Sequence, residues 1–205
     1  LAIGVSEDRI FYVGNTMIDT LLANVDQLYA PKLWDREKLQ ARSYFVLTLH
    51  RPNNVDEHEK LMAILRAIEE STRGHKIVFP VHPRTAKFLK DLKNDLPKFV
   101  YADPMGYLEF NYLVKNSVAV ITDSGGITEE ATVMGGPCLS LRDTTERPET
   151  VTVGTNELVG TDPSKLKSAL DRVFAGQWKK GGIPEKWDGK TGERIVAHLE
   201  RLLSS

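Results

Sequence analysis

The chain has 205 residues, which is enough for one domain with a sizeable core. Hydrophobic residues make up 41% and charged residues 27%, the balance of an ordinary globular protein. A formal net charge of −1 gives no reason to expect nucleic-acid or membrane binding, and no apolar run approaches the ~18 residues of a membrane span. The single cysteine, Cys138, excludes an internal disulfide, and we expect a cytoplasmic protein.

The start of the chain suggests an upstream segment. The chain opens on Leu1 rather than on methionine, and its first residues resemble the tail of a helix. They lack the basic start and apolar stretch of a signal peptide. We therefore expect that a further segment precedes Leu1.

Short apolar runs typical of strands alternate along the chain with stretches whose apolar residues have helical spacing. In chain order, the predicted strands are 10–13, 44–49, 76–81, 99–101, 118–122, 137–141 and 157–159. The predicted helices are 18–28, 61–68, 86–92, 108–114, 127–134, 163–174 and 193–203, with a Gly- and Lys-rich loop at 176–192. This alternation favours right-handed βαβ units, and so an α/β, Rossmann-like parallel sheet with helices on both faces.

Polar and basic side chains follow four of the predicted strands. In open α/β sheets, ligands bind beyond the carboxyl ends of the strands, so these side chains are expected at one binding edge. The four groups are His50 with Arg51, His82 with Arg84, residues 123–126, and residues 142–147.

The turn at residues 123–126, Asp-Ser-Gly-Gly, joins a predicted buried strand to a predicted helix. Gly125 and Gly126 allow a ligand to approach the backbone closely, and the helix N-terminus offers free N–H groups with partial positive charge. Ser124 can add a hydroxyl donor. The turn is therefore a candidate phosphate cradle. The alternative is a tight turn in which Asp123 or Ser124 only caps the helix.

Glu130 and Arg147 are further candidates at this edge. Glu130 lies four residues after Gly126, where a carboxylate could accept both hydroxyls of a ribose, although carboxylates in a first helical turn also favour the helix dipole. Arginine forms paired, charge-assisted hydrogen bonds with phosphate, and Pro148 stiffens the turn at Arg147. The alternative is that Arg147 pairs with a nearby surface carboxylate.

Several other kinds of site are not supported. The histidines lack metal-ligand spacing with acidic neighbours, so we expect no metal site, and we expect no cofactor. Cys138 lies in an apolar strand and is interpreted as a core residue. The G-x-S-x-G elbow of serine hydrolases and the G-x-x-x-x-G-K-[ST] loop are both absent from the sequence.

Five blocks of sequence carry a resemblance to a known family. Residues 122–131 (TDSGGITEEA) resemble the DSGGxxEE signature of the non-hydrolysing UDP-N-acetylglucosamine 2-epimerases, and 141–149 (LRDTTERPE) resemble their RDxTERPE block. Residues 13–16, 48–51 and 81–84 are similar to three more blocks in the same order. Two positions depart from the pattern: Asn53 replaces an acidic residue, and Thr128 replaces a glutamine.

The resemblance implies a fold and a reaction. The family has two Rossmann-like domains in the arrangement of GT-B glycosyltransferases, and this chain resembles the second domain with the linker into it. The implied reaction inverts C2 of the sugar by eliminating UDP to a glucal-type intermediate and adding it back, with the proton on the other face. The family's acid and base carboxylates lie in the other domain, so we expect the chain alone to be inactive.

The resemblance also implies roles for individual residues. Ser124, Gly125 and Gly126 would hold the diphosphate and Glu130 the ribose, while Arg147 would contact phosphate. The remaining roles place Phe110 beside the uracil, His50 near the reacting groups, and Arg51 and His82 at a second UDP-GlcNAc that acts as an effector.

The expected organisation has three parts. Residues 1–30 form a linker with an entry strand and helix, 31–180 the UDP-binding domain, and 181–205 a loop and helix that pack towards the missing N-terminal domain. The full-length protein is expected to be a homodimer. Two other functions stay open: the donor domain of a GT-B glycosyltransferase, and a stand-alone nucleotide-sugar binding or regulatory module.

Overall fold

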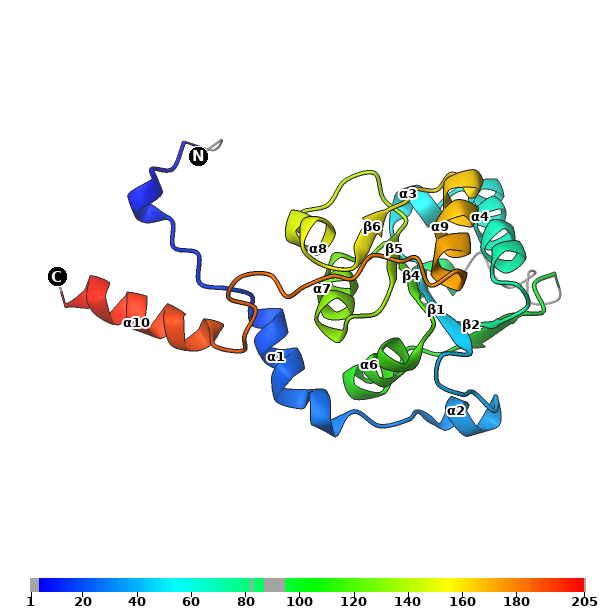
Figure 1. The fold of residues 1–205 in the computed structure, drawn as a ribbon, viewed down its shortest axis with the longest axis horizontal. Helices are drawn as coiled ribbons and strands as arrows, with labels where there is room; N and C mark the ends of the chain where they lie inside the picture. The colour runs from blue at the N-terminus through cyan, green and yellow to red at the C-terminus, as the bar shows by residue number, and fades with distance from the viewer. Residues whose placement is uncertain (1–3, 82, 87–94, 205) are drawn as a thin grey trace.

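The computed structural model describes residues 4–81, 83–86 and 95–204, and its centre is one parallel six-stranded sheet (Figure 1). The strand order is β3-β2-β1-β4-β5-β6, and every neighbouring pair is parallel. The strands are β1 Tyr44–Thr48, β2 Lys76–Pro80, β3 Phe99–Ala102, β4 Val120–Thr122, β5 Cys138–Ser140 and β6 Asn156–Leu158. This arrangement confirms the predicted α/β, Rossmann-like fold.

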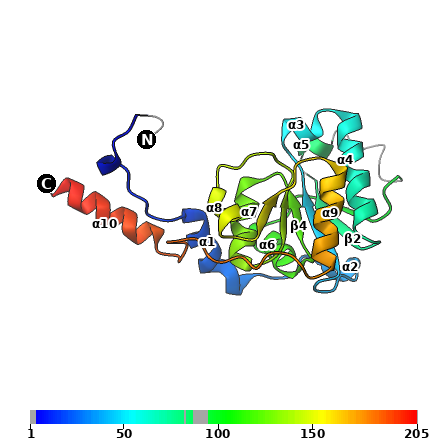
Figure 2. The ribbon, with the colours of Figure 1, turned by 45° about the horizontal axis from the view of Figure 1, so that its top comes forward.

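Alternate side chains of each strand enter two cores on opposite faces of the sheet, as the twofold period of a strand requires. Phe45 and Leu47 of β1 face the core that contains α4 (His58–Ser71) and α9 (Pro163–Phe174). Tyr44 and Val46 face the core that contains α2 (Lys32–Arg36) and α6 (Tyr107–Asn116). Figure 2 shows α4 and α9 side by side over their face. Helices therefore cover both faces, as predicted.

The remaining helices are short or lie near the ends of the chain. They are α1 Thr16–Asn24, α3 Pro52–Val55, α5 Pro83–Ala86, α7 Gly125–Met134, α8 Pro148–Thr152 and α10 Thr191–Leu203, with 3-10 turns at Glu7–Arg9 and Val25–Gln27. Helices α2, α3 and α8 were not predicted, because four or five residues are too few to establish a helical period. Most of the predicted helix at 86–92 lies outside the described residues.

The predicted entry strand at 10–13 is wrong. These residues are extended, but they pair with no strand of the sheet, and Ile10, Phe11 and Tyr12 are about half exposed. The apolar side chains of this extended segment therefore lie on the surface and not in a buried strand. No helix in the described part of the chain is long and apolar enough to cross a membrane.

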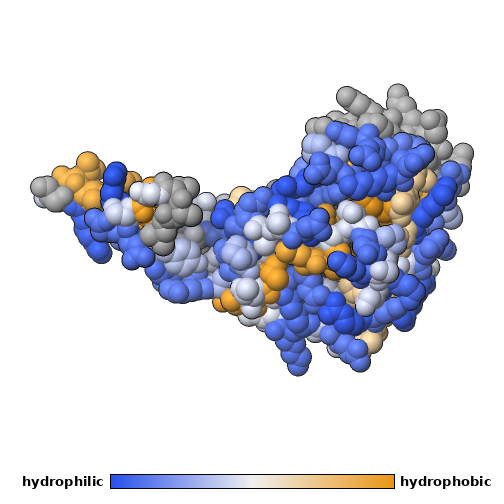
Figure 3. Space-filling model, turned by 90° about the horizontal axis from the view of Figure 1, so that it is seen from above, coloured by the Kyte–Doolittle hydropathy of each residue, from blue (hydrophilic) through white to orange (hydrophobic). Residues whose placement is uncertain are grey.

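Residues 4–13 and α10 project together from the sheet as one arm (Figure 1). The ring of Phe11 packs against that of His198, with centroids 4.5 Å apart. The arm carries exposed apolar side chains on α10, among them Val196, Leu199 and Leu202. Figure 3 shows hydrophobic residues at the far end of the arm.

The two segments of the arm leave the body of the protein at a crossing, formed by residues 12–14 and 186–194. Arg194 donates to the Val13 carbonyl at 3.1 Å, and the Lys186 ammonium donates to the Tyr12 carbonyl at 2.8 Å. Gly14 has a φ of +117°, which favours glycine, and a β-carbon there would collide with the Lys186 carbonyl oxygen and lie 2.6 Å from the Thr191 hydroxyl. The crossing therefore requires glycine at position 14.

We predict that Gly14→Ala opens the crossing while leaving the sheet intact. The added methyl group would be strained by φ and by its neighbours, so the amides of α10 should exchange hydrogen faster, whereas those of β1 should not change. The measurement is hydrogen exchange followed by mass spectrometry. Gly136→Ala is the matched control, because nothing lies within 4 Å of the methyl group added there. Unchanged exchange in α10 would contradict the requirement.

Candidate functional site

The turn between β4 and α7 leaves a helix N-terminus open for a ligand. Ser124 is the N-cap residue of α7, but its side chain makes no capping hydrogen bond. Gly125 and Gly126 form the first turn, and the nearest atoms to a β-carbon on Gly125 would lie 3.9 Å away. A β-carbon on Gly126 would lie 3.4 Å from the Met17 methyl carbon, so Gly125 is the more open of the two glycines. This geometry suits an anion better than the alternative, in which Ser124 caps the helix.

Asp123 precedes this turn and joins it to the loop after β1. Its side chain is fully buried, and it accepts hydrogen bonds from the backbone N–H groups of His50, at 3.1 and 3.2 Å, and of Arg51, at 2.9 Å. The His50 ring nitrogen Nδ1 lies 2.8 Å from its Oδ1. Burial acts to raise the pKa of Asp123, but the hydrogen bonds from His50 and Arg51 outweigh it, so the pKa is lowered. Asp123 is therefore an ionised buried anchor.

The sequence indicated Asp123 only as a possible helix cap. Its partners lie 72 and 73 positions earlier in the chain, so only the sheet, which pairs β1 with β4, brings them together. The structure thus places His50 and Arg51 directly beside the candidate cradle. His82 lies outside the described residues.

Glu146 lies beside the cradle with two arginines. Arg142, which is largely buried, donates two hydrogen bonds to its carboxylate at 2.7 and 2.8 Å, and Nη2 of Arg51 lies 3.7 Å from it. A hydrogen bond from Arg142 lowers the pKa of Glu146 to about 2. The edge therefore has cationic groups, which are at present paired with a carboxylate that is 64% exposed.

Arg147 contacts Glu129, and the neighbouring Glu130 faces a different helix. Arg147 forms an ion pair with Glu129, which is buried, while about half of the arginine side chain stays exposed. The hydrogen bond with Glu129 raises the pKa of Arg147. Glu129, the fifth residue of α7, thus holds the Arg147 guanidinium, whereas the alternative considered from sequence was a nearby surface carboxylate.

Glu130 faces α6 instead. It is only 4% exposed and lies beside Tyr107 and Asn111. Burial raises the pKa of the Glu130 carboxyl; the side chains of Tyr107 and Asn111 offset part of the rise, and the charge of Glu129 adds to it. The Asn111 side chain is fully buried, and neither polar atom of its amide forms a hydrogen bond within the described part of the chain. Phe110 is partly buried and packs against the core of the same face.

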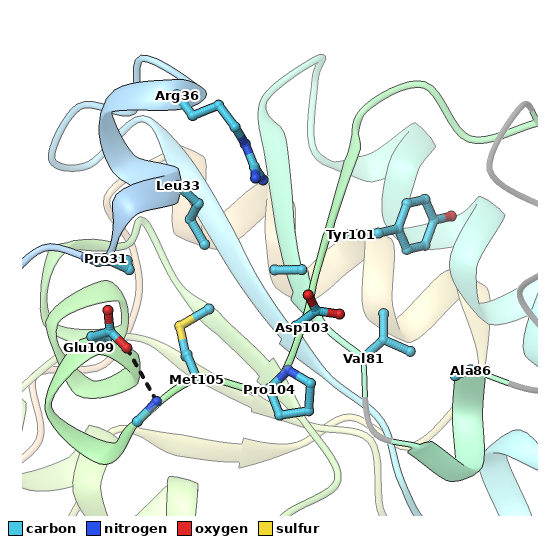
Figure 4. A pocket seen from close by; sticks show the side chains of 12 residues that line it. Pro31, Leu33, Arg36, Val81, Ala86, Tyr101, Asp103, Pro104, Met105 and Glu109 are labelled. Carbon is cyan, nitrogen blue, oxygen red and sulfur yellow. Dashed lines mark hydrogen bonds between the residues drawn. The ribbon is translucent and has the colours of Figure 1, made fainter.

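A cavity of about 680 Å³ opens on the other side of the start of α6. Figure 4 shows its lining, in which Asp103, Met105 and Glu109 lie between α2 and the end of β2. Its volume is within the range of small-molecule sites, and it lies at the carboxyl edge of the sheet. No sequence pattern indicated this cavity, because α2, which forms one wall, is too short to be predicted.

The described residues contain no cluster of three His, Cys, Asp or Glu side chains that could hold a metal ion. What the edge offers is a helix N-terminus with Arg51, Arg142 and Arg147 around it. Such a set can bind a phosphate or diphosphate and stabilise negative charge that develops there.

Comparisons with known proteins agree with this chemistry. A family model described as UDP-N-acetylglucosamine 2-epimerase matches residues 1–200. The UDP-N-acetylglucosamine 2-epimerase of Methanocaldococcus jannaschii is 41% identical in an alignment of 207 positions, which covers 96% of this chain and 56% of that protein. The structure of that enzyme in complex with UDP-GlcNAc and UDP superposes with a TM-score of 0.83 over 98% of this chain and 57% of the other.

Two further similarities define the breadth of the match. A UDP-2,3-diacetamido-2,3-dideoxy-D-glucuronate 2-epimerase of Pseudomonas aeruginosa is 39% identical over 95% of this chain and 53% of its own length. A UDP-glucose:anthocyanidin 3-O-glucosyltransferase shares 13% identity, 82% coverage of this chain and 42% of its own, and a TM-score of 0.50, which shows a common fold. The chain spans little more than half the length of these epimerases, and it belongs to the UDP-N-acetylglucosamine 2-epimerase family.

Proposed function

We propose that this chain is the UDP-binding part of a non-hydrolysing UDP-N-acetylglucosamine 2-epimerase, which interconverts UDP-GlcNAc and UDP-ManNAc. The observation that carries the proposal is the open N-terminus of α7 at Gly125 and Gly126, surrounded by arginines, in a chain of this family. A UDP leaving group is a diphosphate anion, and this edge is built to receive one. With one buried cysteine, Cys138, the cytoplasm stays our proposed location.

In this proposal the nucleotide lies along the carboxyl edge. The diphosphate binds at Ser124, Gly125 and Gly126, with Arg147 turning from Glu129 to share its charge with a phosphate. The ribose lies at Glu130 on the α6 side of α7, and the uracil lies by Phe110. These positions follow from the order of the groups along the edge and from the family resemblance.

The remaining residues act near the sugar. His50 lies by the reacting groups, because Asp123 holds it at the start of the cradle. We assign Arg51 and His82 to an effector UDP-GlcNAc. The pairing of Arg51 with Asp123 and Glu146 leaves it at the mouth of the site, consistent with contact to a second anion.

The reaction removes the proton from C2 and breaks the C1–oxygen bond. The C–H electron pair becomes the C1–C2 double bond, and the bond pair at C1 leaves with UDP. Re-addition of UDP with a proton on the other face of C2 gives the epimer. This chain supplies groups that hold UDP, and we propose that the acid and base carboxylates belong to a domain that precedes residue 1.

We further propose that this preceding domain packs on the arm. Exposed Ile10 and Phe11 lie with the apolar side chains of α10, such as Leu199 and Leu202, on a projection that the sheet does not cover. The relatives have nearly half of their length beyond the matched region, which is enough for a second domain. Burying this apolar surface would favour docking.

Of the three predictions that test this proposal, the first concerns activity. Incubated with UDP-GlcNAc in deuterated water, the chain alone should leave the C2 proton signal of the sugar intact while the uracil signals broaden. The measurement is proton NMR over hours, with bovine serum albumin as the control for non-specific broadening. Loss of the C2 signal with appearance of the manno epimer would place the acid and base within this chain. Transfer of the sugar to an added acceptor, without inversion, would favour a glycosyltransferase.

The second prediction concerns Arg147. Arg147→Ala should weaken UDP binding by on the order of 1.5–3 kcal/mol, because a charge-assisted hydrogen bond to phosphate is lost. Isothermal titration calorimetry measures the affinity. Arg66→Ala, on the exposed face of α4, is the matched control. Because the variant leaves Glu129 buried without its partner, a thermal melt must show that the protein is folded. Equal affinity in a folded variant would remove Arg147 from the site.

The third prediction uses the raised pKa of Glu130. A carboxyl whose folded-state pKa exceeds its unfolded value adds stability below about pH 4 that is lost as the pH rises through the folded pKa. Glu130→Gln cannot ionise, so its Tm relative to the parent protein should increase between about pH 4 and pH 7. It should also lose the preference for UDP over 2′-deoxy-UDP. Glu200→Gln, exposed on α10, is the control. A Tm difference independent of pH would contradict the raised pKa.

A further inference from the structure

We infer that Asp123 is a positioning residue for His50, and that it fixes the neutral imidazole with its proton on Nδ1. The inference deepens the proposed function, since it says how His50 is presented to a ligand in the cradle. It concerns a residue that was expected, at most, to cap a helix.

The first step is the contact itself. The Nδ1 atom of His50 lies 2.8 Å from Oδ1 of Asp123, which is a hydrogen-bond distance. Asp123 is ionised, because the net effect of its surroundings is to lower its pKa, and an ionised carboxylate can only accept. The proton between the two atoms therefore belongs to Nδ1. A solvated neutral imidazole instead favours the proton on Nε2, so the protein selects the minor tautomer.

The Asp123 carboxylate is held against the His50 ring by its other hydrogen bonds. It is fully buried, and besides the ring it accepts from the backbone N–H groups of His50 and Arg51 and from the Asn54 amide at 3.2 Å. Rotating the carboxylate would break its hydrogen bonds with the two backbone N–H groups and with the Asn54 amide. The acceptor that orients the ring is thus itself held by other groups.

The contact with Asp123 also determines where the other ring nitrogen of His50 points. With Nδ1 turned to Asp123, the other ring nitrogen, Nε2, is the atom that His50 directs away from the anchor, and the side chain is 41% exposed. Asp123 is also the residue before Ser124, and its carbonyl accepts from Nε of Arg51 at 2.9 Å. Asp123 therefore orients the imidazole with its side chain and begins the cradle with its backbone. The ring contact and the peptide bond to Ser124 together fix the distance between the imidazole and the cradle.

The experiment reads the tautomer without any ligand. The protein is labelled with nitrogen-15 in histidine, and long-range proton–nitrogen NMR spectra are recorded at about pH 8, above the ordinary pKa of histidine. His50→Gln identifies the His50 signals. We expect the Nδ1-protonated pattern in the parent protein. Asp123→Asn should change it to the Nε2-protonated pattern, because the amide can donate to Nδ1 while its oxygen still accepts from the backbone.

A matched control separates positioning from a purely structural role. Asn54→Ala removes another donor to the same carboxylate but leaves the ring contact, so it should keep the Nδ1-protonated pattern. If Asp123→Asn does not fold, the parent spectrum still decides. An Nε2-protonated His50 in the parent, or the same tautomer in a folded Asp123→Asn variant, would overturn the inference.

The tautomer of His50 can be measured whether or not the chain binds UDP. Titrating UDP into the labelled protein tests that function, since His50 signals should shift when the cradle is filled. A fixed tautomer with no response to UDP would support the positioning role and contradict the proposed ligand. A response to UDP with the wrong tautomer would do the reverse.

Discussion

The buried carboxylate of Asp123 lies where two crossover units of the sheet meet, and the rest of the binding edge depends on it. A charge without solvent is tolerated only with several donors, and here the donors are supplied by His50, Arg51 and Asn54 in the neighbouring loop. The carboxylate thereby connects the end of β1 to the start of α7. Asp123 thus orders the turn that precedes Gly125 and Gly126, where we propose that the diphosphate binds.

The same edge arranges its charges in pairs. Glu146 holds Arg142, and Glu129 holds Arg147, so the cations are oriented before a ligand arrives. In the Glu146 pair the carboxylate is exposed and Arg142 is largely buried, whereas in the Arg147 pair the carboxylate, Glu129, is buried. Burying Glu130 against α6 with a raised pKa has a cost in stability that a ribose could offset. In our proposal, this arrangement prepares the edge for an anion.

The strand and helix alternation and the glycine turn could be predicted from sequence because they rest on local patterns. The apolar run at 44–49 and the DSGG turn each carry their own signal within a few residues. The role of Asp123, the pairing of Arg147 with Glu129 and the cavity beside α6 could not be predicted. Each of them depends on which strands are neighbours, or on helices too short to have a period. The apolar run at 10–13 led to a wrong strand prediction, because an apolar pattern does not show whether other residues cover the side chains.

The crossing at Gly14 has a mechanical consequence. Arg194 belongs to α10 and bonds to the first segment of the arm, so the crossing couples the two segments to each other. Helix α1 begins two residues beyond Gly14, and the methyl carbon of its Met17 lies against Gly126, 3.4 Å from where a β-carbon would be. Through Met17, and through the packing of Ile18 and Leu21 near Val133 and Met134, α1 couples the crossing to α7.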